Sequence, residues 1–229
     1  MTHFYRLQAT FILLVAALSG SLFAQTTTHV TVTPTGIFAT IDTSRSVTAI
    51  KALASGSDEQ KRATLSEIDA TPEVFLPPVF YATSRELAAR NDLDKALFWF
   101  YAGQLRARYD ANRCADPSAR SAVAALNTQM PDSVRKHQFA IVDRLEGVVR
   151  SVLDWDEKTP YRYDHRWINL HGIAAIKSGM GEPVSNDLVI SLPEAQWESV
   201  RKKTRDEWLI GFLQVLPNLR KTAEQQGLR

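Results

Sequence analysis

The stretch from Leu93 to Asp110 constrains the fold of this 229-residue chain more than any other feature. Its middle, residues 97–101, reads Leu-Phe-Trp-Phe-Tyr, so apolar side chains would point to every side of a helix. A helix that is hydrophobic all round must be enclosed by neighbours on several faces. The stretch therefore predicts the central helix of an all-α domain.

Helix signals recur along the rest of the chain. Ser57 and Gln60 have the spacing of a capping box, in which each side chain bonds a free amide at the start of a helix. Pro77, Pro117 and Pro131 mark the starts of further helices. The backbone N–H groups of a first helical turn have no partner within the helix, so proline, which has no backbone N–H, is favoured there. The predicted helices span about residues 46–53, 57–68, 77–90, 93–110, 116–129, 131–155 and 191–216.

Two long apolar stripes predict how much of the chain is packed. From Val134 to Trp155, apolar residues recur at steps of three, four or seven, which predicts a single buried helix face. Trp197 to Val215 forms a similar face near the C-terminus. We therefore predict one bundle-like domain of six or seven helices over residues 44–229.

Two segments lack a long helical pattern. Residues 25–43 alternate apolar and polar side chains up to Ile41, which predicts a small β-hairpin or a leader without fixed structure. Residues 159–192 show no long period, apart from a short helix expected at about 164–178. Structureless connections beyond about 12–15 residues are uncommon in compact domains unless they are functional or mobile. The irregular segment 159–192 is therefore the candidate functional region.

The first 24 residues have the pattern of a secretory signal peptide. His3 and Arg6 precede an apolar run at 11–18, and small residues lead to Ala24. The run is shorter than the roughly 20 apolar residues that a membrane span needs. Gln25, not Cys, follows the expected cleavage, so no thiol is available for a lipid anchor. We expect cleavage near Ala24, a periplasmic or secreted product, and no membrane span in it.

The charge balance and the cysteine count exclude other classes. The chain has 27 basic and 25 acidic residues, and removal of residues 1–24 leaves a net charge of +1. A nearly neutral chain has no field to attract nucleic acid. The single cysteine, Cys114, cannot form an internal disulfide. It is expected to be an inert thiol near a helix end, with a nucleophile or an intermolecular partner as the alternatives.

Aromatic, basic and histidine side chains concentrate between residues 161 and 171. Aromatic and arginine side chains dominate the energetics of protein interfaces. We therefore predict that this stretch binds a protein partner. The predicted partner-binding residues are Tyr161, Tyr163, His165, Arg166, Trp167 and His171.

The same stretch permits a chemical alternative. Asp164 near His165 or His171 could support acid–base chemistry, because a carboxylate orients an imidazole whose pKa lies near neutrality. Six residues separate the two histidines, so they would not share a helix face as the four-residue spacing of a zinc helix requires. No phosphate-binding loop or nucleophile elbow accompanies them. We expect neither a metal ion nor a cofactor.

The predicted hairpin over residues 78–110 orders large and small packing residues as Phe80, Leu87, Ala96, Phe100 and Gly103. This order resembles one helix pair of the tetratricopeptide or Sel1-like repeats. The resemblance covers about 30 of the 229 residues. Ser84 replaces the usual Gly, Arg108 replaces the closing Pro, and no adjacent repeat follows. The resemblance implies protein binding rather than chemistry.

A second resemblance concerns the whole chain. The cleavable leader, the helical body and the run from Phe98 to Arg106 look like exported helical proteins of Gram-negative bacteria, some of which neutralise secreted antibacterial toxins. These proteins share no site motif, so no functional residue is carried over. The resemblance implies an immunity factor whose partner is a cognate toxin.

These observations predict a periplasmic, non-enzymatic protein-binding protein, most concretely an immunity factor. The alternative is an exported hydrolase or lyase that uses His165 or His171 with Asp164. A third possibility is an envelope scaffold that holds a small molecule between helices, in a pocket lined by Trp99, Tyr101 and Trp155.

Overall fold

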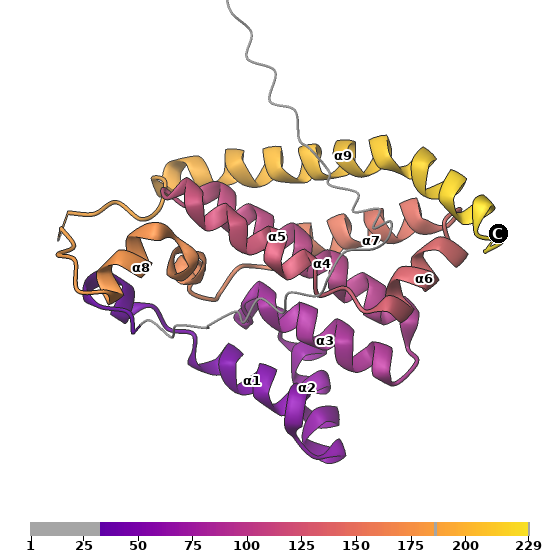
Figure 1. Ribbon diagram of the computed structural model, residues 1–229, viewed down its shortest axis with the longest axis horizontal. Helices are drawn as coiled ribbons and strands as arrows, with labels where there is room; N and C mark the ends of the chain where they lie inside the picture. Colours follow the sequence, from indigo (N-terminus) through magenta and orange to yellow (C-terminus); the bar gives the residue numbers. More distant parts are fainter. Residues whose placement is uncertain (1–32, 186, 229) are drawn as a thin grey trace, which may run out of the picture. The chain divides into compact units, whose positions relative to one another are not determined.

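The computed structural model describes residues 33–185 and 187–228, and in these ranges every regular element is a helix, apart from one isolated bridge between Cys114 and Ser191 (Figure 1). The predicted all-α fold class is confirmed, with nine α-helices in the described part in place of six or seven. The α-helices are α1 Ser44–Ser55, α2 Asp58–Ala70, α3 Pro77–Ala89, α4 Leu93–Arg113, α5 Ser121–Asn127, α6 Asp132–Ala140, α7 Leu145–Lys158, α8 Ile173–Gly179 and α9 Trp197–Gln225. The short 3-10 helices are η1 Gly36–Thr40, η2 Pro72–Val74, η3 Pro117–Arg120, η4 His165–His171 and η5 Glu194–Gln196.

The helix predicted to be central, α4, contacts most of the others. It packs against α3, α5, α6, α7 and α9, and Figure 1 shows it running between them. Side chains on different faces of α4, including Leu97, Ala102 and Leu105, are completely buried. The all-round apolar sequence of α4 is therefore explained by enclosure, as expected.

Aromatic rings fill the space between α3, α4 and α7. Ring centroids lie 5.0 Å apart for Phe80 and Trp99 and 5.5 Å apart for Trp99 and Trp155. Trp99 meets Trp155 nearly edge to face, a favourable arrangement of ring quadrupoles. Since these rings pack on one another, the pocket suggested there for a small molecule is occupied by side chains.

The helix starts follow their capping residues. The Ser57 hydroxyl accepts a hydrogen bond from the backbone N–H of Gln60 at 3.2 Å, and the backbone N–H of Ser57 donates to Gln60 Oε1 at 2.8 Å. The predicted capping box is therefore confirmed. Asp92 caps α4 through its carboxylate. Asn91 takes a φ of 63°, a left-handed conformation that asparagine tolerates better than most residues. It makes the tight turn between α3 and α4.

The apolar stripe from Val134 to Trp155 is divided between two helices, so the prediction of one helix there is wrong. The chain turns at residues 141–144 between α6 and α7. Ile141, Val142 and Leu145 are all buried around this turn. The stripe keeps its spacing because both helices and the turn face the same core.

The hairpin predicted over residues 25–43 is not formed in its described part. Residues 25–32 lie outside the described residues, whereas Gly36–Thr40 forms the 3-10 helix η1 instead of a strand. In a β-strand, Ile37, Ala39 and Ile41 would face the core and Phe38 would face the solvent. Phe38 is instead almost completely buried. Burial of this large ring decides the local conformation against the β pattern.

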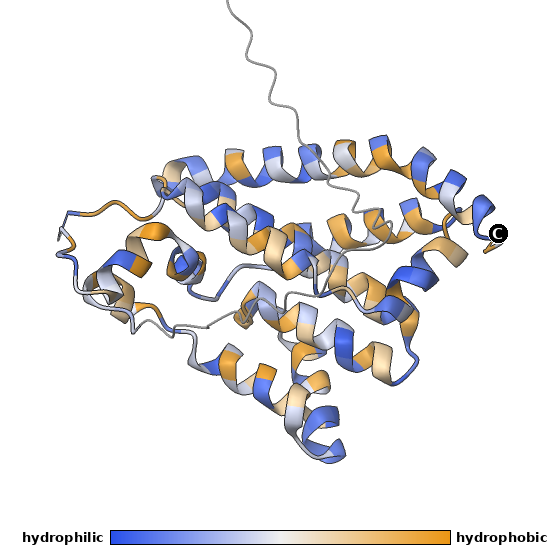
Figure 2. Cartoon of the chain, in the orientation of Figure 1, coloured by the Kyte–Doolittle hydropathy of each residue, from blue (hydrophilic) through white to orange (hydrophobic). Residues whose placement is uncertain are grey.

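The predicted C-terminal helix continues beyond its expected end. Helix α9 passes Pro217 and reaches Gln225. Trp208, Phe212 and Leu216 bury one face at intervals of four residues, and Figure 2 shows hydrophobic and hydrophilic residues alternating along α9. No helix of the described residues is long and apolar enough to cross a membrane.

The buried apolar residues form two clusters. The larger surrounds the first half of α4 and includes residues of α1, α3, α6, α7 and α9. The smaller joins the second half of α4 to η1, η3, η4 and α8, with Phe38, Ala111, Trp167 and Ile168 among its members. The irregular segment 159–192 is therefore a packed part of the domain in which η4 and α8 are formed.

Candidate functional site

The aromatic half of segment 159–192 faces inward. Trp167 is only 2% exposed, and its indole N–H donates to Asp110 Oδ2 at 2.7 Å. The Tyr161 hydroxyl donates to Asp156 Oδ1 at 2.6 Å. Three predicted partner-binding residues, Tyr161, Tyr163 and Trp167, thus face the interior and attach their segment to α4 and α7.

Asp156 is the centre of a buried ion-pair network. Both Arg106 and Asp156 are completely buried, and Arg106 Nε donates to Asp156 Oδ1 at 3.0 Å. Arg205 of α9 donates to the other carboxylate oxygen at 2.8 Å. The Arg106 guanidinium lies between the rings of Trp155 and Tyr161, 4.4 and 4.2 Å from their centroids. The network connects α4, α7 and α9 and compensates the charge of a buried arginine.

A second buried ion pair lies within α4, and Trp167 of η4 bonds to its carboxylate. Arg113 Nη2 donates to Asp110 Oδ1 at 2.7 Å, and the guanidinium lies 4.4 Å from the Tyr109 ring centroid and 4.9 Å from that of Trp197. Burial raises the pKa of the Asp110 carboxyl, although Arg113 and the Trp167 N–H oppose this shift. These contacts are those of a structural support.

His165 and Asp164 do not form the pair that acid–base chemistry would use. The Asp164 carboxylate accepts two hydrogen bonds from the Arg166 guanidinium, at 2.7 and 2.9 Å. His165 Nε2 instead lies 2.9 Å from Ser191 Oγ. Burial, together with the charge of Arg113, lowers the pKa of His165 to about 4. His165 is therefore neutral at neutral pH.

His171 lies apart from His165. Its side chain is exposed, and its ring centroid is 5.7 Å from that of Trp167. In the described part of the chain, no group of three histidine, cysteine or acidic residues is placed to hold a metal ion.

Cys114 is buried and hydrogen-bonded. Its thiol donates to Asn169 Oδ1 at 3.0 Å. Burial raises the pKa of the thiol, so the thiolate needed for nucleophilic chemistry is disfavoured.

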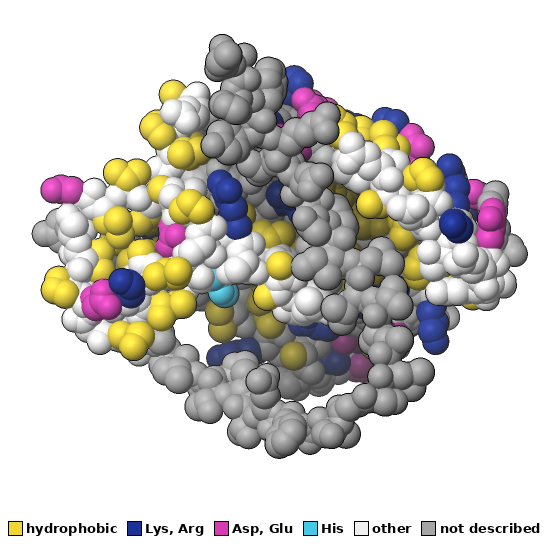
Figure 3. Space-filling view, turned by 45° about the horizontal axis from the view of Figure 1, so that its top comes forward, with side chains coloured by type: hydrophobic (Ala, Val, Ile, Leu, Met, Phe, Trp, Pro, Cys, Tyr) yellow, Lys and Arg dark blue, Asp and Glu magenta, His cyan; other side chains and the backbone are white. Residues whose placement is uncertain are grey.

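The exposed apolar residues gather on the other half of the segment. Met180 is 75% exposed, Val189 67%, Ile173 55% and Ile176 42%. We call these four residues the α8 surface. Figure 3 shows hydrophobic side chains gathered at the left of the view, the end at which Figure 1 places α8. Leaving such side chains in water is unfavourable unless a partner covers them.

Helix α8 is held firmly beneath this surface. Ser118 Oγ and Asp116 Oδ2 accept from the first amides of α8, those of Ile173 and Ala174, at 2.8 and 3.3 Å. At the other end, the Thr35 hydroxyl donates to the Ser178 carbonyl at 3.1 Å. The inner residues Ala175 and Ser178 are buried. Ile173 and Ile176 are therefore presented on a fixed helix, whereas Met180 directly follows its end and Val189 lies in the loop beyond it.

Two open cavities lie elsewhere on the described part. One, of about 290 Å³, is lined by residues of α1, α2 and α3. The other, of about 250 Å³, is lined in part by Arg162, Tyr163 and Asp164, together with Asp42 and Arg45. Asp42 and Asp164 contribute carboxylates to this second cavity, but Arg45 and Arg162 are already paired with Glu67 and Glu73.

The predicted helix hairpin is formed by α3 and α4. A side chain at Gly103 would place its Cβ 2.9 Å from the Tyr81 ring, so the small residue permits the two helices to approach closely. Comparison of the chain with protein families, characterised proteins and solved structures gives no match. The resemblance to tetratricopeptide and Sel1-like repeats therefore stays a prediction.

Proposed function

We propose that this chain is an exported, non-enzymatic protein-binding protein that holds its partner on the α8 surface. The observation that carries the proposal is the grouping of exposed aliphatic side chains. Of the eight large hydrophobic residues exposed in the described part, four lie between residues 173 and 189. Single exposed apolar residues are ordinary, whereas Ile173, Ile176 and Met180 are spaced at three and four residues, as on one face of a helix, which is typical of an interaction site.

The charges near the α8 surface indicate the chemistry of its partner. Lys177 and Glu182 pair with each other at 3.5 Å, so together they add no net charge. A partner that covers this surface is expected to bring an apolar centre with polar groups at its edge. The fixed α8 suits tight binding, because little conformational entropy is lost on association.

The most concrete candidate in this class is a periplasmic immunity factor that covers a secreted antibacterial toxin. The proposal is supported by the signal-peptide pattern of residues 1–24, which lie outside the described residues, and by the resemblance to exported helical proteins. Export predicts that the chain from the periplasmic fraction begins near Gln25. A chain that kept residues 1–24 in the cytosol would contradict the proposal.

The six residues predicted to bind the partner have unequal roles in this proposal. Tyr161, Tyr163 and Trp167 support the segment from inside, since each faces the buried Asp–Arg contacts. His171 is exposed near the start of α8 and remains a contact candidate. Arg166 is partly exposed but bonded to Asp164 and to the Thr40 carbonyl.

The test takes the product of the neighbouring reading frame as the toxin candidate and measures its binding to this chain. The double variant Ile176→Ser, Met180→Ser removes exposed apolar contacts without touching the buried face of α8. We expect it to weaken binding at least about tenfold, because interface cores concentrate binding energy in few side chains. Ile210→Ser on α9, at 54% exposure, is the matched control and should bind normally. Equal binding by the double variant and the control would exclude the α8 surface.

The hydrolase or lyase alternative has one observation in its favour. His165 Nε2 lies 2.9 Å from Ser191 Oγ, the arrangement of a base beside a nucleophile. The surroundings of His165 argue against this alternative. Burial and the charge of Arg113 lower the pKa of His165 to about 4, which disfavours the imidazolium that proton transfer would create. If the alternative is right, His165→Ala and Ser191→Ala each lower turnover of an ester panel about 10²–10⁴-fold. Absence of turnover by the unaltered chain would dismiss it.

A further inference from the structure

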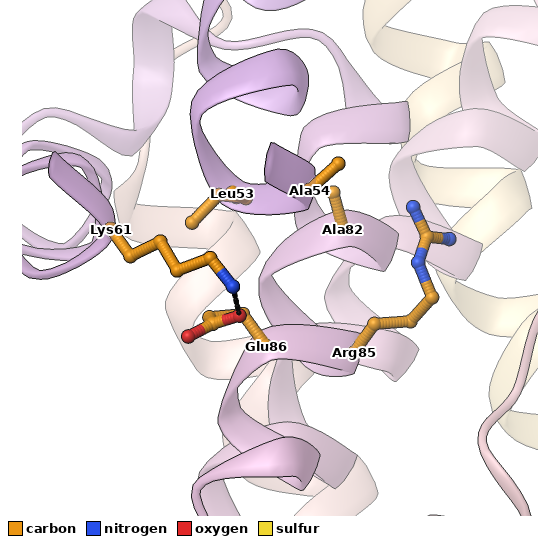
Figure 4. A pocket seen from close by; sticks show the side chains of 6 residues that line it. All are labelled: Leu53, Ala54, Lys61, Ala82, Arg85 and Glu86. Carbon is orange, nitrogen blue, oxygen red and sulfur yellow. Dashed lines mark hydrogen bonds and ion pairs between the residues drawn. The ribbon is translucent and has the colours of Figure 1, made fainter. Parts of the chain in front are cut away.

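The larger cavity combines an apolar floor with a charged edge. It has a volume of about 290 Å³, and Figure 4 shows Lys61 and Arg85 on opposite sides of the small apolar surface made by α1 and α3. We call it the α1–α3 pocket. It is lined by Leu53, Ala54, Lys61, Ala82, Arg85 and Glu86.

The charges on one side of the pocket are already compensated. Lys61 Nζ lies 2.9 Å from Glu86 Oε2, and Arg90 Nε lies 2.7 Å from Glu86 Oε1. The Glu86 side chain is 8% exposed and is shared by both cations. This carboxylate therefore stabilises the contact between α2 and α3, and it already engages Lys61 at that end of the pocket.

Arg85 carries the pocket's uncompensated charge. In the described part, its guanidinium donates to the neutral side chain of Gln129, and no ion pair joins it to an acidic residue. A guanidinium has five N–H donors, so Arg85 retains donors for a ligand.

We propose that the α1–α3 pocket binds an aliphatic monocarboxylate, with its carboxylate on Arg85 and its hydrocarbon chain on Leu53, Ala54 and Ala82. A planar carboxylate matches the paired donors of a guanidinium, and such charge-assisted hydrogen bonds are the stronger ones. The cavity lies at the small end of ligand sites, so it suits a chain of about six carbons. Arg85 fixes the orientation, because Lys61 at the opposite end is already paired with Glu86.

The proposal is independent of the α8 surface and concerns a different part of the fold. Figure 1 shows α1, α2 and α3 together, away from α8. The chain would then bind a small molecule at α1–α3 in addition to the protein partner proposed for the α8 surface.

The test titrates the chain with hexanoate and follows the backbone amide signals of Ala54 and Ala82 by NMR. We expect saturable shifts at these residues, and weaker binding of hexan-1-ol, which has the same chain without a charge. Arg85→Gln should weaken hexanoate binding about tenfold or more, since it removes the charge-assisted bonds. Arg62→Gln, an exposed arginine on α2 outside the pocket lining, is the matched control and should bind normally.

Three results would overturn the proposal. They are the absence of saturable shifts up to about 10 mM hexanoate, equal binding by Arg85→Gln and the control, and shifts that concentrate outside α1–α3. Arg85 is exposed on its helix, so Arg85→Gln is expected to fold, and its circular dichroism spectrum should match that of the control.

Discussion

Asp156 shows how one residue organises several others. Its carboxylate accepts from Arg106, Tyr161 and Arg205, which come from three different parts of the chain. Burying an arginine is costly unless its charge is paired, and Arg106 is paired with Asp156 and also donates from Nη2 to the Thr159 carbonyl. The sequence shows a carboxylate among aromatic residues at this place, but it does not show that the carboxylate points inward.

Asp156→Ala is predicted to destabilise the fold by about 3–5 kcal/mol, because it leaves Arg106 buried without its counter-charge. Glu146→Ala breaks an exposed pair with Arg150 and should cost about 1 kcal/mol or less. Urea unfolding followed by circular dichroism gives both values. Similar losses for the two variants would mean that the buried network contributes little.

At the scale of elements, the sequence predicts helices better than it predicts their ends. The capping box at Ser57 and the enclosed α4 depend on neighbouring residues, and both are confirmed. The turn at residues 141–144 and the 3-10 helix at Gly36 depend on which side chains reach the core, so local pattern misses them. The same limit applies to the candidate site.

Three of the predicted partner-binding residues face the interior, whereas the proposed partner surface lies in the second half of the same segment. Tyr, Trp and Arg are typical of interfaces, yet here the Tyr161 ring packs on the buried Arg106 and the Trp167 indole bonds to the buried Asp110 of α4. The spacing of Ile173, Ile176 and Met180 at three and four residues was a usable signal for a second apolar helix face. The inward-facing residues of α8, Ala175 and Ser178, are small, so the sequence alone does not indicate an amphipathic helix there.

Gly172 determines how α8 begins. A Cβ at this position would overlap the Asp116 carboxylate, which accepts the amide of Ala174 at the start of α8. Gly172→Ala is therefore predicted to destabilise the fold by about 1–3 kcal/mol and to weaken binding at the α8 surface. Gly147→Ala places its Cβ where no atom lies within 4 Å, in the first turn of α7.

The two glycines thus make a matched pair. Gly147→Ala should raise stability by about 0.4–1 kcal/mol, because alanine restricts the unfolded chain more than glycine does. Thermal unfolding of both variants measures the difference. A stable Gly172→Ala variant would show that the start of α8 adjusts at little cost.

For the whole molecule, the buried groups predict how stability responds to acid. The pKa of His165 is about 4 in the folded chain and about 6.5 when unfolded, so the unfolded state binds the proton more readily as pH falls below 6.5. Its contribution is complete above pH 6.5 and is lost as pH falls toward 4. The groups facing His165 agree with this direction, since Arg113 and Arg166 oppose a second positive charge more than Asp164 favours it.

His165→Gln is predicted to flatten this dependence while an amide keeps a hydrogen bond to Ser191. The free energy of unfolding, measured in urea at pH 7.0, 6.0 and 5.0, should fall with acid in the unaltered chain and fall less in the variant. This range avoids the carboxyl groups whose pKa values are lowered in the fold, such as Asp116 and Asp164, which lose their contribution at lower pH. Equal slopes for the two proteins would mean that His165 is protonated as easily in the folded chain as in the unfolded one. It would then also be available as a base near neutrality, and the case for recognition over catalysis would lose its main electrostatic argument.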